Sequence, residues 1–527
     1  MTEPIASQLS AAAAAPFLQG RAVLVLGLGA SGLAMARWCL HAGAQVTVAD
    51  TRAAPPQLAT LLQALPGARF IHGAFDAALL QASAASLVVK SPGLAPAQVA
   101  TLSAVAQAAG VPVTGELGLF AQALQELQQS RAYLPEVLAI TGTNGKTTVT
   151  ALTGQLVARA GKTVAVAGNI GPTLLDTLRS HLDADTLPAV WVLELSSFQL
   201  ADAAAASAAL AGAPAGFEPT AATVLNITQD HLDWHGDMPA YAQAKSRVFG
   251  QRALMVLNRD DPLVMALRVP ATKGRPQRAC ICFGGGMPQR PGDFGIEQVN
   301  GMSWLVRAMD LDLTIRLRKG QEAEALHIQR LMPAEALRIR GRHNAANALA
   351  ALALAAAAGC TLAPLLFALR EYQGEPHRVA SLGVVGDVEY FDDSKGTNVG
   401  ATVAALNGLG PERSLIPILG GDGKGQDFMP LAAPVARYAR AVVLIGRDAP
   451  LIRHALKGSG VLLLAAETLP QAVLLASQQA RTGDAVLLSP ACASLDMFDD
   501  YVHRARVFAE AVQALALDAG AVLEGTG

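Results

Sequence analysis

Short apolar runs alternate with glycine-rich turns and helical patterns along this chain of 527 residues. Near the N-terminus, residues 22–26 form an apolar run that predicts a buried strand, and residues 33–42 follow a glycine turn with helical spacing. Further apolar runs at residues 45–49 and 87–89 predict two more strands. Strand, helix and strand in this order predict a parallel, doubly wound α/β sheet.

Two more cycles of the same kind follow. The second has a helix that ends at Arg159, and its predicted strands cover residues 137–140, 163–167, 190–195 and 222–227. The third has predicted strands at residues 388–391, 414–419, 441–445 and 485–488. Residues 283–331 mix glycine, proline and polar positions and receive no assignment, and residues 206–216 predict a surface loop. We therefore expect three α/β domains, with limits at residues 20–113, 114–374 and 375–527.

Composition supports a globular protein, since 52% of the residues are hydrophobic and 16% are charged. The most apolar stretch, residues 345–358, is shorter than the ~20 residues of a membrane span and predicts a buried helix. A net charge of −2 without basic runs argues against a nucleic-acid partner. No basic segment precedes an apolar one at the N-terminus, so no secretory signal is expected. The cysteines are few and scattered, which favours reduced thiols in the cytoplasm and no zinc site: Cys39, Cys280, Cys282, Cys360 and Cys492.

The strongest chemical signal is Thr-Gly-Thr-Asn-Gly-Lys-Thr-Thr at residues 141–148. A strand that enters a glycine turn and then a helix presents backbone N–H groups to phosphate oxygens. Lys146 can reach the outer phosphates, and the Thr147 hydroxyl can bind Mg²⁺. The loop is shorter than the G-x-x-x-x-G-K-[ST] pattern, because Gly142 lies only three residues before Gly145.

Another glycine turn, residues 27–32, fits G-x-G-x-x-G between a strand and a helix. Asp50 ends the next strand, near the position that binds a ribose in dinucleotide-binding folds. This motif alone suggests NAD, yet Asp50, Thr51 and Arg52 are equally suited to another nucleotide. The turn therefore predicts a nucleotide site without identifying the nucleotide.

Three further residues are candidates because of where the predicted strands and helices place them. Glu194 ends an apolar strand beside the phosphate loop, which suits Mg²⁺ binding. His231 follows another strand and Lys245 lies on the next predicted helix, but a single histidine or lysine is more often a solvated polar residue.

Asn344 and Asn347 lie three residues apart at the start of the alanine-rich helix, so they share a face and suit a purine or ribose. Capping of that helix by Asn344 is the competing explanation. Lys424 is surrounded by four glycines after a predicted strand, which favours a contact with an anion.

Together these segments resemble the Mur ligase family over nearly the whole chain. The motifs typical of the family are residues 141–148, Asp-His-Leu-Asp at 230–233, Gly-Arg-His-Asn-Ala-Ala-Asn at 341–347 and Asp-Ser-Lys-Gly-Thr-Asn at 393–398. Motifs typical of the members that add D-glutamate are Asp-Thr-Arg at 50–52, Ser-Pro-Gly at 91–93 and Ser-Pro-Ala-Cys-Ala-Ser-Leu-Asp at 489–496.

The resemblance implies an N-terminal Rossmann-like UDP-binding domain, a central P-loop-type ATPase domain and a C-terminal Rossmann-like domain that binds the amino acid. It implies that ATP phosphorylates the alanyl carboxylate of UDP-N-acetylmuramoyl-L-alanine, and that D-glutamate displaces phosphate from the acyl phosphate. Contacts to the UDP-substrate are then expected from Ser31, Asp50, Thr51, Arg52, Ser91 and Asn169.

The same resemblance assigns the remaining site residues. ATP contacts are expected from Gly142, Thr143, Asn144, Gly145, Lys146, Thr147, Thr148, Asn344, Asn347, Arg378 and Asp393. Two Mg²⁺ ions are expected on Thr147, Glu194, His231 and a carbamate that CO₂ forms on Lys245; the catalytic set is Lys146, Glu194, His231 and Lys245. D-Glutamate contacts are expected from Thr397, Lys424, Ser494 and Tyr501, the last of which stands where a phenylalanine is familiar.

Three alternatives remain open at this level. A sister ligase for another amino acid, or a folate-type polyglutamate ligase, would share the ATP machinery, but no Asp-Asn-Pro-Arg motif of the diamino-acid enzymes is present. An NAD-dependent dehydrogenase would use residues 27–32 and leave residues 141–148 unexplained. A nucleotide switch would bind ATP without depending on an amino acid. We expect a cytoplasmic monomer that acts on small molecules, away from membranes.

Overall fold

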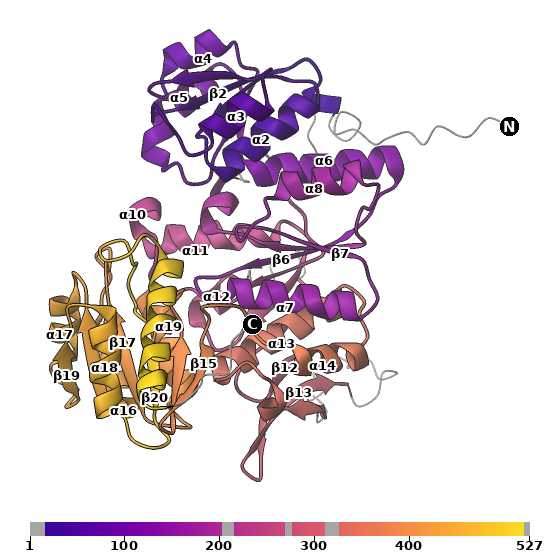
Figure 1. Ribbon diagram of the computed structural model, residues 1–527. Coiled ribbons are helices and arrows are strands. Elements are labelled where there is room, and N and C mark those ends of the chain that lie inside the picture. The colour runs from indigo at the N-terminus through magenta and orange to yellow at the C-terminus, as the bar shows by residue number, and fades with distance from the viewer. Residues whose placement is uncertain (1–15, 203–215, 269–276, 311–325, 521–527) are drawn as a thin grey trace.

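The computed structural model describes residues 16–202, 216–268, 277–310 and 326–520. Most of the predicted surface loop at residues 206–216 therefore lies outside the described residues. Figure 1 shows three units, with the N-terminal unit at the top, the central unit below it and the C-terminal unit beside the central one. Each unit is built on its own sheet, as the three strand-helix cycles in the sequence predict.

The N-terminal unit is a five-stranded parallel sheet in the order β3-β2-β1-β4-β5. Apolar runs become its buried central strands, while β3 is only half-buried, which explains why the apolar pattern did not reveal it. The elements are η1 (Pro16–Leu18), β1 (Ala22–Leu26), α2 (Ala30–His41), β2 (Gln45–Asp50), α3 (Leu58–Ala64), β3 (Arg69–His72), α4 (Ala77–Ser83), β4 (Leu87–Lys90), α5 (Pro96–Ala108) and β5 (Val113–Thr114).

The central unit contains a six-stranded parallel sheet in the order β11-β10-β9-β6-β8-β7. Its strands are β6 (Glu136–Thr141), β7 (Val164–Gly168), β8 (Val190–Glu194), β9 (Ala221–Val224), β10 (Leu254–Asn258) and β11 (Cys280–Phe283). Its helices are α6 (Glu116–Arg131), α7 (Lys146–Arg159), α8 (Leu174–Asp183), α10 (Leu232–His235), α11 (Met238–Ser246), η2 (Arg247–Phe249), α12 (Pro262–Ala266), η3 (Ala334–Ala336), α13 (Arg342–Ala357) and α14 (Leu362–Glu371).

Two features of the central unit differ from the sequence-based prediction or extend it. The strand predicted over residues 222–227 ends at Val224, because the chain then turns so that Asn226 can bind the phosphate loop. The unassigned region contains a three-stranded antiparallel sheet of β12 (Phe294–Val299), β13 (Met302–Met309) and β14 (His327–Pro333). The apolar helix is confirmed as α13, whose residues 348–355 are buried against α7.

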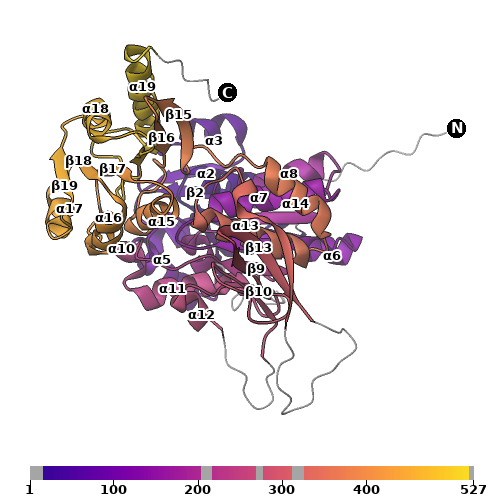
Figure 2. The ribbon, with the colours of Figure 1, turned by 90° about the horizontal axis from the view of Figure 1, so that it is seen from below.

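The C-terminal unit is a six-stranded sheet in the order β15-β16-β20-β17-β18-β19, in which only the edge strand β15 runs antiparallel to its neighbour. Figure 2 shows this unit beside the central one from below. Its elements are β15 (Ala380–Val385), β16 (Val388–Asp392), α15 (Val399–Leu409), β17 (Leu415–Gly420), η4 (Met429–Leu431), α16 (Ala432–Tyr438), β18 (Ala441–Ile445), α17 (Ala449–Leu456), β19 (Leu462–Ala465), α18 (Leu469–Gln479), β20 (Ala485–Leu488) and α19 (Tyr501–Asp518).

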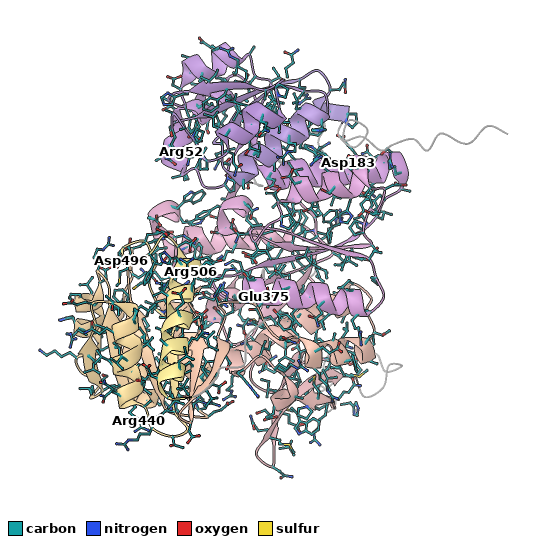
Figure 3. The ribbon with its side chains drawn as sticks, in the orientation of Figure 1. Arg52, Asp183, Glu375, Arg440, Asp496 and Arg506 are labelled. Carbon is teal, nitrogen blue, oxygen red and sulfur yellow. The ribbon has the colours of Figure 1, made fainter. Side chains whose placement is uncertain are left out.

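Contacts between units hold the molecule together. Arg37 of α2 forms an ion pair with Asp176 of α8 at 2.6 Å, and Lys90 at the end of β4 pairs with Asp202 at 2.9 Å. Figure 3 shows Arg52 at the lower edge of the N-terminal unit and Glu375 where the central unit meets the C-terminal one. Among the helices of the described ranges, none has the length and apolarity that a membrane crossing needs.

Candidate active site

The phosphate loop lies where β6 ends and α7 begins. Gly142 has φ +154° and Gly145, the residue before α7, has φ +84°, conformations that side chains other than glycine rarely adopt. A Cβ atom at Gly145 would lie 2.9 Å from Oδ1 of Asn347, so this glycine also permits close packing on α13. The turn predicted from the sequence is confirmed, and its backbone conformation explains its glycines.

Three neighbouring strands bring polar groups to this loop, because β8, β6 and β9 lie side by side and all run in the same direction. Glu194 ends β8 opposite Ile140 of β6. Asn226 follows β9, and its Oδ1 accepts a hydrogen bond of 2.8 Å from the backbone N–H of Asn144. The carboxyl ends of parallel strands thus form one edge of the sheet, where α/β proteins bind ligands.

Lys146 lies across the loop. Its Nζ donates hydrogen bonds of 2.8 Å to the carbonyl oxygens of Gly142 and Thr143. Burial lowers the pKa of this ammonium, and the nearby Glu194 carboxylate opposes that shift. A partly desolvated ammonium at the start of a helix is well suited to bind an anion such as a phosphate.

Glu194 has one oxygen with a hydrogen-bond partner and one without. Nδ2 of Asn169 donates to its Oε1 at 2.9 Å, whereas its buried Oε2 has no partner among the described residues. A buried carboxylate oxygen without a donor fits a cation, and oxygen ligands suit Mg²⁺. Thr147 is buried in the first turn of α7, and its Oγ1 lies 3.4 Å from Nζ of Lys395. The residues present therefore fit the Mg²⁺ that the sequence predicts.

Lys245 lies on α11, as predicted, and is 1% exposed. Its Nζ donates a hydrogen bond of 2.8 Å to the Gly142 carbonyl and lies 4.5 Å from the centre of the Tyr241 ring. Burial and the Lys146 ammonium lower the pKa of Lys245 well below its usual value, and Asp230 opposes them. The two lysines meet at Gly142, so a neutral Lys245 amine reduces the repulsion between them.

His231 stands at the start of α10 in the left-handed conformation, with φ +55°. Its ring packs edge-on against Phe198 at 4.8 Å, and its Nε2 lies 3.6 Å from Oδ2 of Asp230. Burial lowers the pKa of His231, and Asp230 opposes this shift. The neutral imidazole is the form that binds metal ions.

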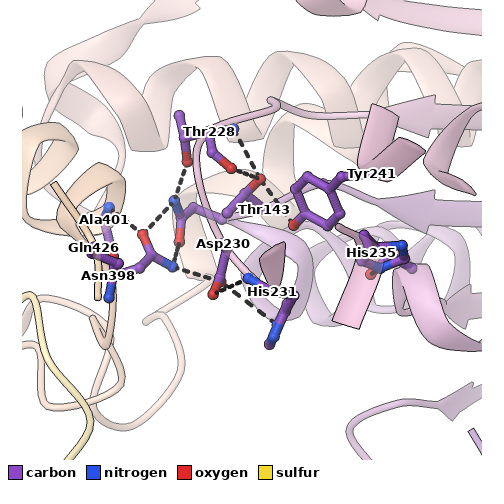
Figure 4. Close-up of polar contacts among 12 residues, drawn as sticks. Thr143, Thr228, Asp230, His231, His235, Tyr241, Asn398, Ala401 and Gln426 are labelled. Carbon is purple, nitrogen blue, oxygen red and sulfur yellow. Dashed lines mark hydrogen bonds and ion pairs between the residues drawn. The ribbon is translucent and has the colours of Figure 1, made fainter. Parts of the chain in front are cut away.

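Asn398 is a site residue that sequence reasoning did not select. Nδ2 of Asn144 donates to Oδ1 of Asn398 at 3.1 Å, and Nδ2 of Asn398 donates to Oδ1 of Asn144 at 3.0 Å. Nδ2 of Asn398 also reaches Oδ2 of Asp230 at 3.2 Å, and its Oδ1 accepts the backbone N–H of Ala401 (Figure 4). These bonds join the phosphate loop to the first helix of the C-terminal unit.

The predicted ATP residues beyond the loop gather around a narrow cavity of ≈ 80 Å³. Its walls come from the loop, the start of α13 and the C-terminal unit, and include Gly145, Asn344, Asn347, Arg378 and Asp393. Burial raises the pKa of Asp393 to about 7, although Ser489 donates a hydrogen bond of 2.7 Å to this carboxyl group.

Capping of α13 by Asn344 is not what the structure shows. The residue before the helix is Gly341, with φ +93°, and Nδ2 of Asn344 donates to the Arg340 carbonyl at 2.8 Å. Nδ2 of Asn347 donates to Oδ1 of Asn344 at 3.1 Å, so the two amides share a face as the spacing predicted. His343, which the sequence did not single out, lines the same cavity, and burial lowers its pKa to about 4.

The four residues predicted for D-glutamate follow the carboxyl ends of β16, β17 and β20, which are neighbours in the C-terminal sheet. Lys424 has a left-handed backbone, and its N–H donates to Oδ1 of Asp422 at 2.9 Å. Ser494 is buried, while Tyr501 begins α19 with its ring 5.7 Å from Nζ of Lys395. Thr397 donates its backbone N–H to the Lys395 carbonyl. Lys395 therefore lies between Tyr501 and Thr147, another position that the sequence did not reveal.

The glycine turn at residues 27–32 has a different chemistry. The backbone N–H of Leu28 donates to Oδ2 of Asp50 at 2.8 Å, and Arg52 binds the same carboxylate through Nε at 2.9 Å and Nη2 at 2.8 Å. This pairing with Arg52, together with the N–H bonds, lowers the pKa of Asp50 to about 2 despite burial. Ser91 donates its hydroxyl to the Gly27 carbonyl at 2.9 Å. Of the other predicted residues, Thr51 is exposed and Asn169 binds Glu194.

Comparison with known proteins decides the family. Residues 21–115 match the Mur ligase MurD-like N-terminal domain, residues 140–355 the Mur ligase middle domain and residues 377–492 the Mur ligase glutamate ligase domain. The UDP-N-acetylmuramoylalanine--D-glutamate ligase of Albidiferax ferrireducens is 66% identical over 96% of this chain and 99% of its own length. The chain belongs to the Mur ligase family. The enzyme of the same name from Burkholderia thailandensis is 57% identical over 95% of this chain and 98% of its own length.

Solved Mur ligases share the fold. MurF from Thermotoga maritima in complex with ADP has a TM-score of 0.54 at 14% identity, covering 95% of this chain and 96% of its own. MurF from Acinetobacter baumannii has the same TM-score at 16% identity, covering 94% of this chain and 92% of its own. The three-domain α/β fold implied by the resemblance is thus confirmed, and membership of the family removes the dehydrogenase hypothesis.

Proposed function

We propose that this Mur ligase joins D-glutamate to UDP-N-acetylmuramoyl-L-alanine, with cleavage of ATP to ADP and phosphate, in peptidoglycan precursor synthesis. The observation that carries the proposal is the 66% identity, over 96% of the chain, to a ligase whose name states this reaction. The phosphate loop with Lys146 can bind phosphate groups, and Glu194, whose Oε2 has no hydrogen-bond partner among the described residues, can bind a cation. ATP-dependent chemistry needs both.

The proposed reaction has two steps. An oxygen of the alanyl carboxylate attacks the γ-phosphorus of ATP, the bond to the β-phosphate oxygen breaks, and ADP leaves. The amine of D-glutamate then attacks the acyl carbon, and phosphate departs with the carboxylate oxygen as the amide forms. Lys146 would exchange its two carbonyl partners for phosphate oxygens, and its fixed charge would stabilise the charge that develops on the transferred group.

Two Mg²⁺ ions would be held by the residues that the sequence predicts. Thr147 and the partner-free oxygen of Glu194 would hold one ion, and His231 with modified Lys245 would hold the other. When bound, these ions supply positive charge that neutralises the phosphate oxygens. Glu194 is kept in place by Asn169, which fixes the direction of its free oxygen.

Lys245 would carry a carbamate. A neutral amine is the form that can attack CO₂, and burial together with the nearby Lys146 ammonium favours that form. The nitrogen lone pair would bond to the carbon of CO₂, the nitrogen would lose a proton, and an anion with two oxygens would replace the neutral amine. A short carboxylate added to a Lys245→Ala variant should restore activity, and the absence of rescue would rule the carbamate out.

The remaining predicted residues would bind the two organic substrates. The first glycine turn with Ser31, Asp50, Thr51, Arg52 and Ser91 would hold the UDP part, and Asn169 would lie between it and Glu194. D-Glutamate would bind to Thr397, Lys424, Ser494 and Tyr501, where the Lys424 ammonium suits a side-chain carboxylate. ATP would bind the loop together with Asn344, Asn347, Arg378 and Asp393 around the narrow cavity.

The division of the chain is part of the same proposal. Domain limits at residues 20–113, 114–374 and 375–527 are supported by family matches at residues 21–115, 140–355 and 377–492. We place the enzyme in the cytoplasm, because ATP is supplied there and its five cysteines are all free. We also propose that the enzyme acts as a monomer.

Phosphate release tests the function. The protein is incubated with ATP, Mg²⁺ and UDP-N-acetylmuramoyl-L-alanine, with and without D-glutamate, and the nucleotide product is weighed by mass spectrometry. The proposal predicts release that depends on D-glutamate and a product heavier by one glutamyl residue. If a diamino acid stimulates phosphate release and D-glutamate does not, the protein is a sister ligase. If no amino acid changes the rate of phosphate release, the protein is a nucleotide switch.

A further inference from the structure

Two cysteines lie together on a strand outside the site described above. Cys280 and Cys282 belong to β11, the edge strand of the central sheet. Residues two apart on a strand point to the same face, so both thiols lie on one side of the sheet. Among the residues that the structure describes, β11 pairs only with β10 in this sheet, so no described strand pairs with its other edge.

A single arginine contacts both sulfur atoms. Nη2 of Arg290 lies 3.0 Å from Sγ of Cys282, and Nη1 and Nη2 each lie 3.6 Å from Sγ of Cys280. A guanidinium group presents several donors in a fixed plane and does not lose its proton in proteins. It therefore favours an anion at the sulfur atoms, and the anionic form of a thiol is the nucleophile.

The charges around the pair include one carboxylate and three arginines. Oδ2 of Asp293 lies 3.6 Å from Nε of Arg290 and 3.9 Å from Nη1 of Arg259, so it orients the guanidinium groups. Oδ1 of Asp293 accepts the backbone N–H of Cys282 at 2.7 Å, and Arg268 adds positive charge near Cys280.

The two thiols are not equivalent. A hydrogen bond with the Cys282 thiol, together with Arg290, lowers the pKa of Cys280, whereas the same hydrogen bond and burial raise the pKa of Cys282. Cys280 is partly exposed, and Cys282 is buried. Negative charge is thus favoured on the more accessible sulfur, that of Cys280, rather than on Cys282.

We propose that Cys280 is a modification site, at which an arginine-bound thiolate reacts with soft electrophiles and is oxidised by hydroperoxides. A sulfur lone pair attacks the peroxide oxygen, an S–O bond forms, the O–O bond breaks, and the leaving oxygen takes a proton from water. The sulfur loses two electrons and becomes a sulfenic acid, while the hydroperoxide is reduced to an alcohol or water.

Cys282 should not close a disulfide with the oxidised residue. Alternate residues of a strand are about 6.6 Å apart, and their Cβ atoms point the same way. A disulfide needs Cβ atoms about 3.8 Å apart, so closure would require β11 to leave its register with β10. The expected product is a sulfenic acid on Cys280 beside an intact Cys282 thiol.

Alkylation of the native protein tests the site, with the other cysteines as internal controls. Cys39, Cys360 and Cys492 are buried, and burial raises the pKa of each. With limiting iodoacetamide at pH 6, peptide mass spectrometry should show Cys280 modified at least about tenfold faster than these three. Equal rates for Cys280 and Cys360 in the folded protein would overturn the proposal.

An arginine variant separates thiolate chemistry from simple exposure. Arg290→Met should slow modification of Cys280 at pH 6 more than at pH 9, because exposure is the same but the thiolate is less stable; an unchanged pH profile would contradict the proposal. Cys282→Ser, which leaves Arg290 in place, provides a second test if the arginine variant folds poorly.

After treatment with hydrogen peroxide, a sulfenic-acid reagent should label Cys280, and an internal disulfide as the main product would refute the predicted outcome.

Discussion

The two glycine turns of this chain have the same local architecture and different chemistry. Residues 27–32 and residues 141–148 each connect a buried parallel strand to a helix. In the first turn, the carboxylate of Asp50 accepts a hydrogen bond from the backbone N–H of Leu28 and another from the Arg52 side chain. In the second turn an ammonium, Lys146, donates to the loop carbonyls.

The difference shows that a strand–turn–helix motif identifies a nucleotide-binding geometry, while the side chains brought to it decide the reaction. A carboxylate at the first turn suits hydroxyl groups such as those of a ribose, so this turn can hold a substrate without activating it. The second turn collects Lys146, Glu194 and Lys245 at the ends of neighbouring elements, which suits transfer of a phosphoryl group. The following variants, ordered from the largest expected effect on activity, test this division.

The largest effect is expected from Lys146→Met, which removes the ammonium and keeps much of the side-chain volume. Loss of one preorganised donor to a developing charge costs about 10²–10³-fold in rate, so phosphate release should fall by about that factor. Calorimetric affinity for UDP-N-acetylmuramoyl-L-alanine should not change. A variant that retains activity within tenfold would contradict the role of the second turn.

Asp50→Asn should act on the first turn alone. Hydrogen bonds to charged groups contribute about 1.5–3 kcal/mol, so the KM for the UDP-substrate should rise by about ten- to a hundredfold, with the KM for ATP unchanged. Asp76→Asn is a matched control, because Asp76 caps α4 in the same unit by accepting the N–H of Leu79. An equal rise in both KM values would show that the two turns are not separate.

Asn398→Ala should weaken the contact between the phosphate loop and the C-terminal unit. Neutral hydrogen bonds contribute about 1 kcal/mol each, so we expect kcat/KM to fall by about thirtyfold for loss of the two bonds of the reciprocal amide pair. A double-mutant cycle with Asn144→Ala gives the coupling directly, expected at about 0.5–3 kcal/mol. Additive effects would mean that the pair does not act as a unit.

The smallest effect on activity is expected at Glu116, the first residue of α6. Its Oε1 accepts the N–H of Leu175 at 3.1 Å. Burial raises the pKa of Glu116 to about 7, although the hydrogen bonds from Leu175 and Ser31 lower it. The folded protein therefore keeps this proton longer than the unfolded chain, so stability is lost as the pH rises from about 4.5 to about 7. Urea unfolding of Glu116→Gln should show a weaker decline over this range, and an identical pH profile would refute the assignment.

Local sequence patterns predicted much of the fold, because buried strands and tight turns are determined largely by residues that lie close together in the sequence. Apolar runs gave β1, β6 and β20 nearly at their observed bounds, and glycine positions gave both turns. The half-buried strands β3 and β15 and the antiparallel β12–β14 sheet lack a continuous apolar run, so the pattern did not reveal them. Asn398 and Lys395 belong to the motif at residues 393–398, but no role was predicted for them because their partners lie about 250 residues away near the phosphate loop.

The most direct test of the proposed ligase follows an oxygen atom. UDP-N-acetylmuramoyl-L-alanine labelled with ¹⁸O in its alanyl carboxylate is incubated with ATP and D-glutamate, and the released phosphate is analysed by mass spectrometry. An acyl phosphate requires one labelled oxygen to leave with each phosphate, and the rate of this transfer should fall by about 10²–10³-fold in the Lys146→Met variant. Unlabelled phosphate from the wild-type protein, formed together with the amide, would contradict phosphorylation of the carboxylate at the second glycine turn.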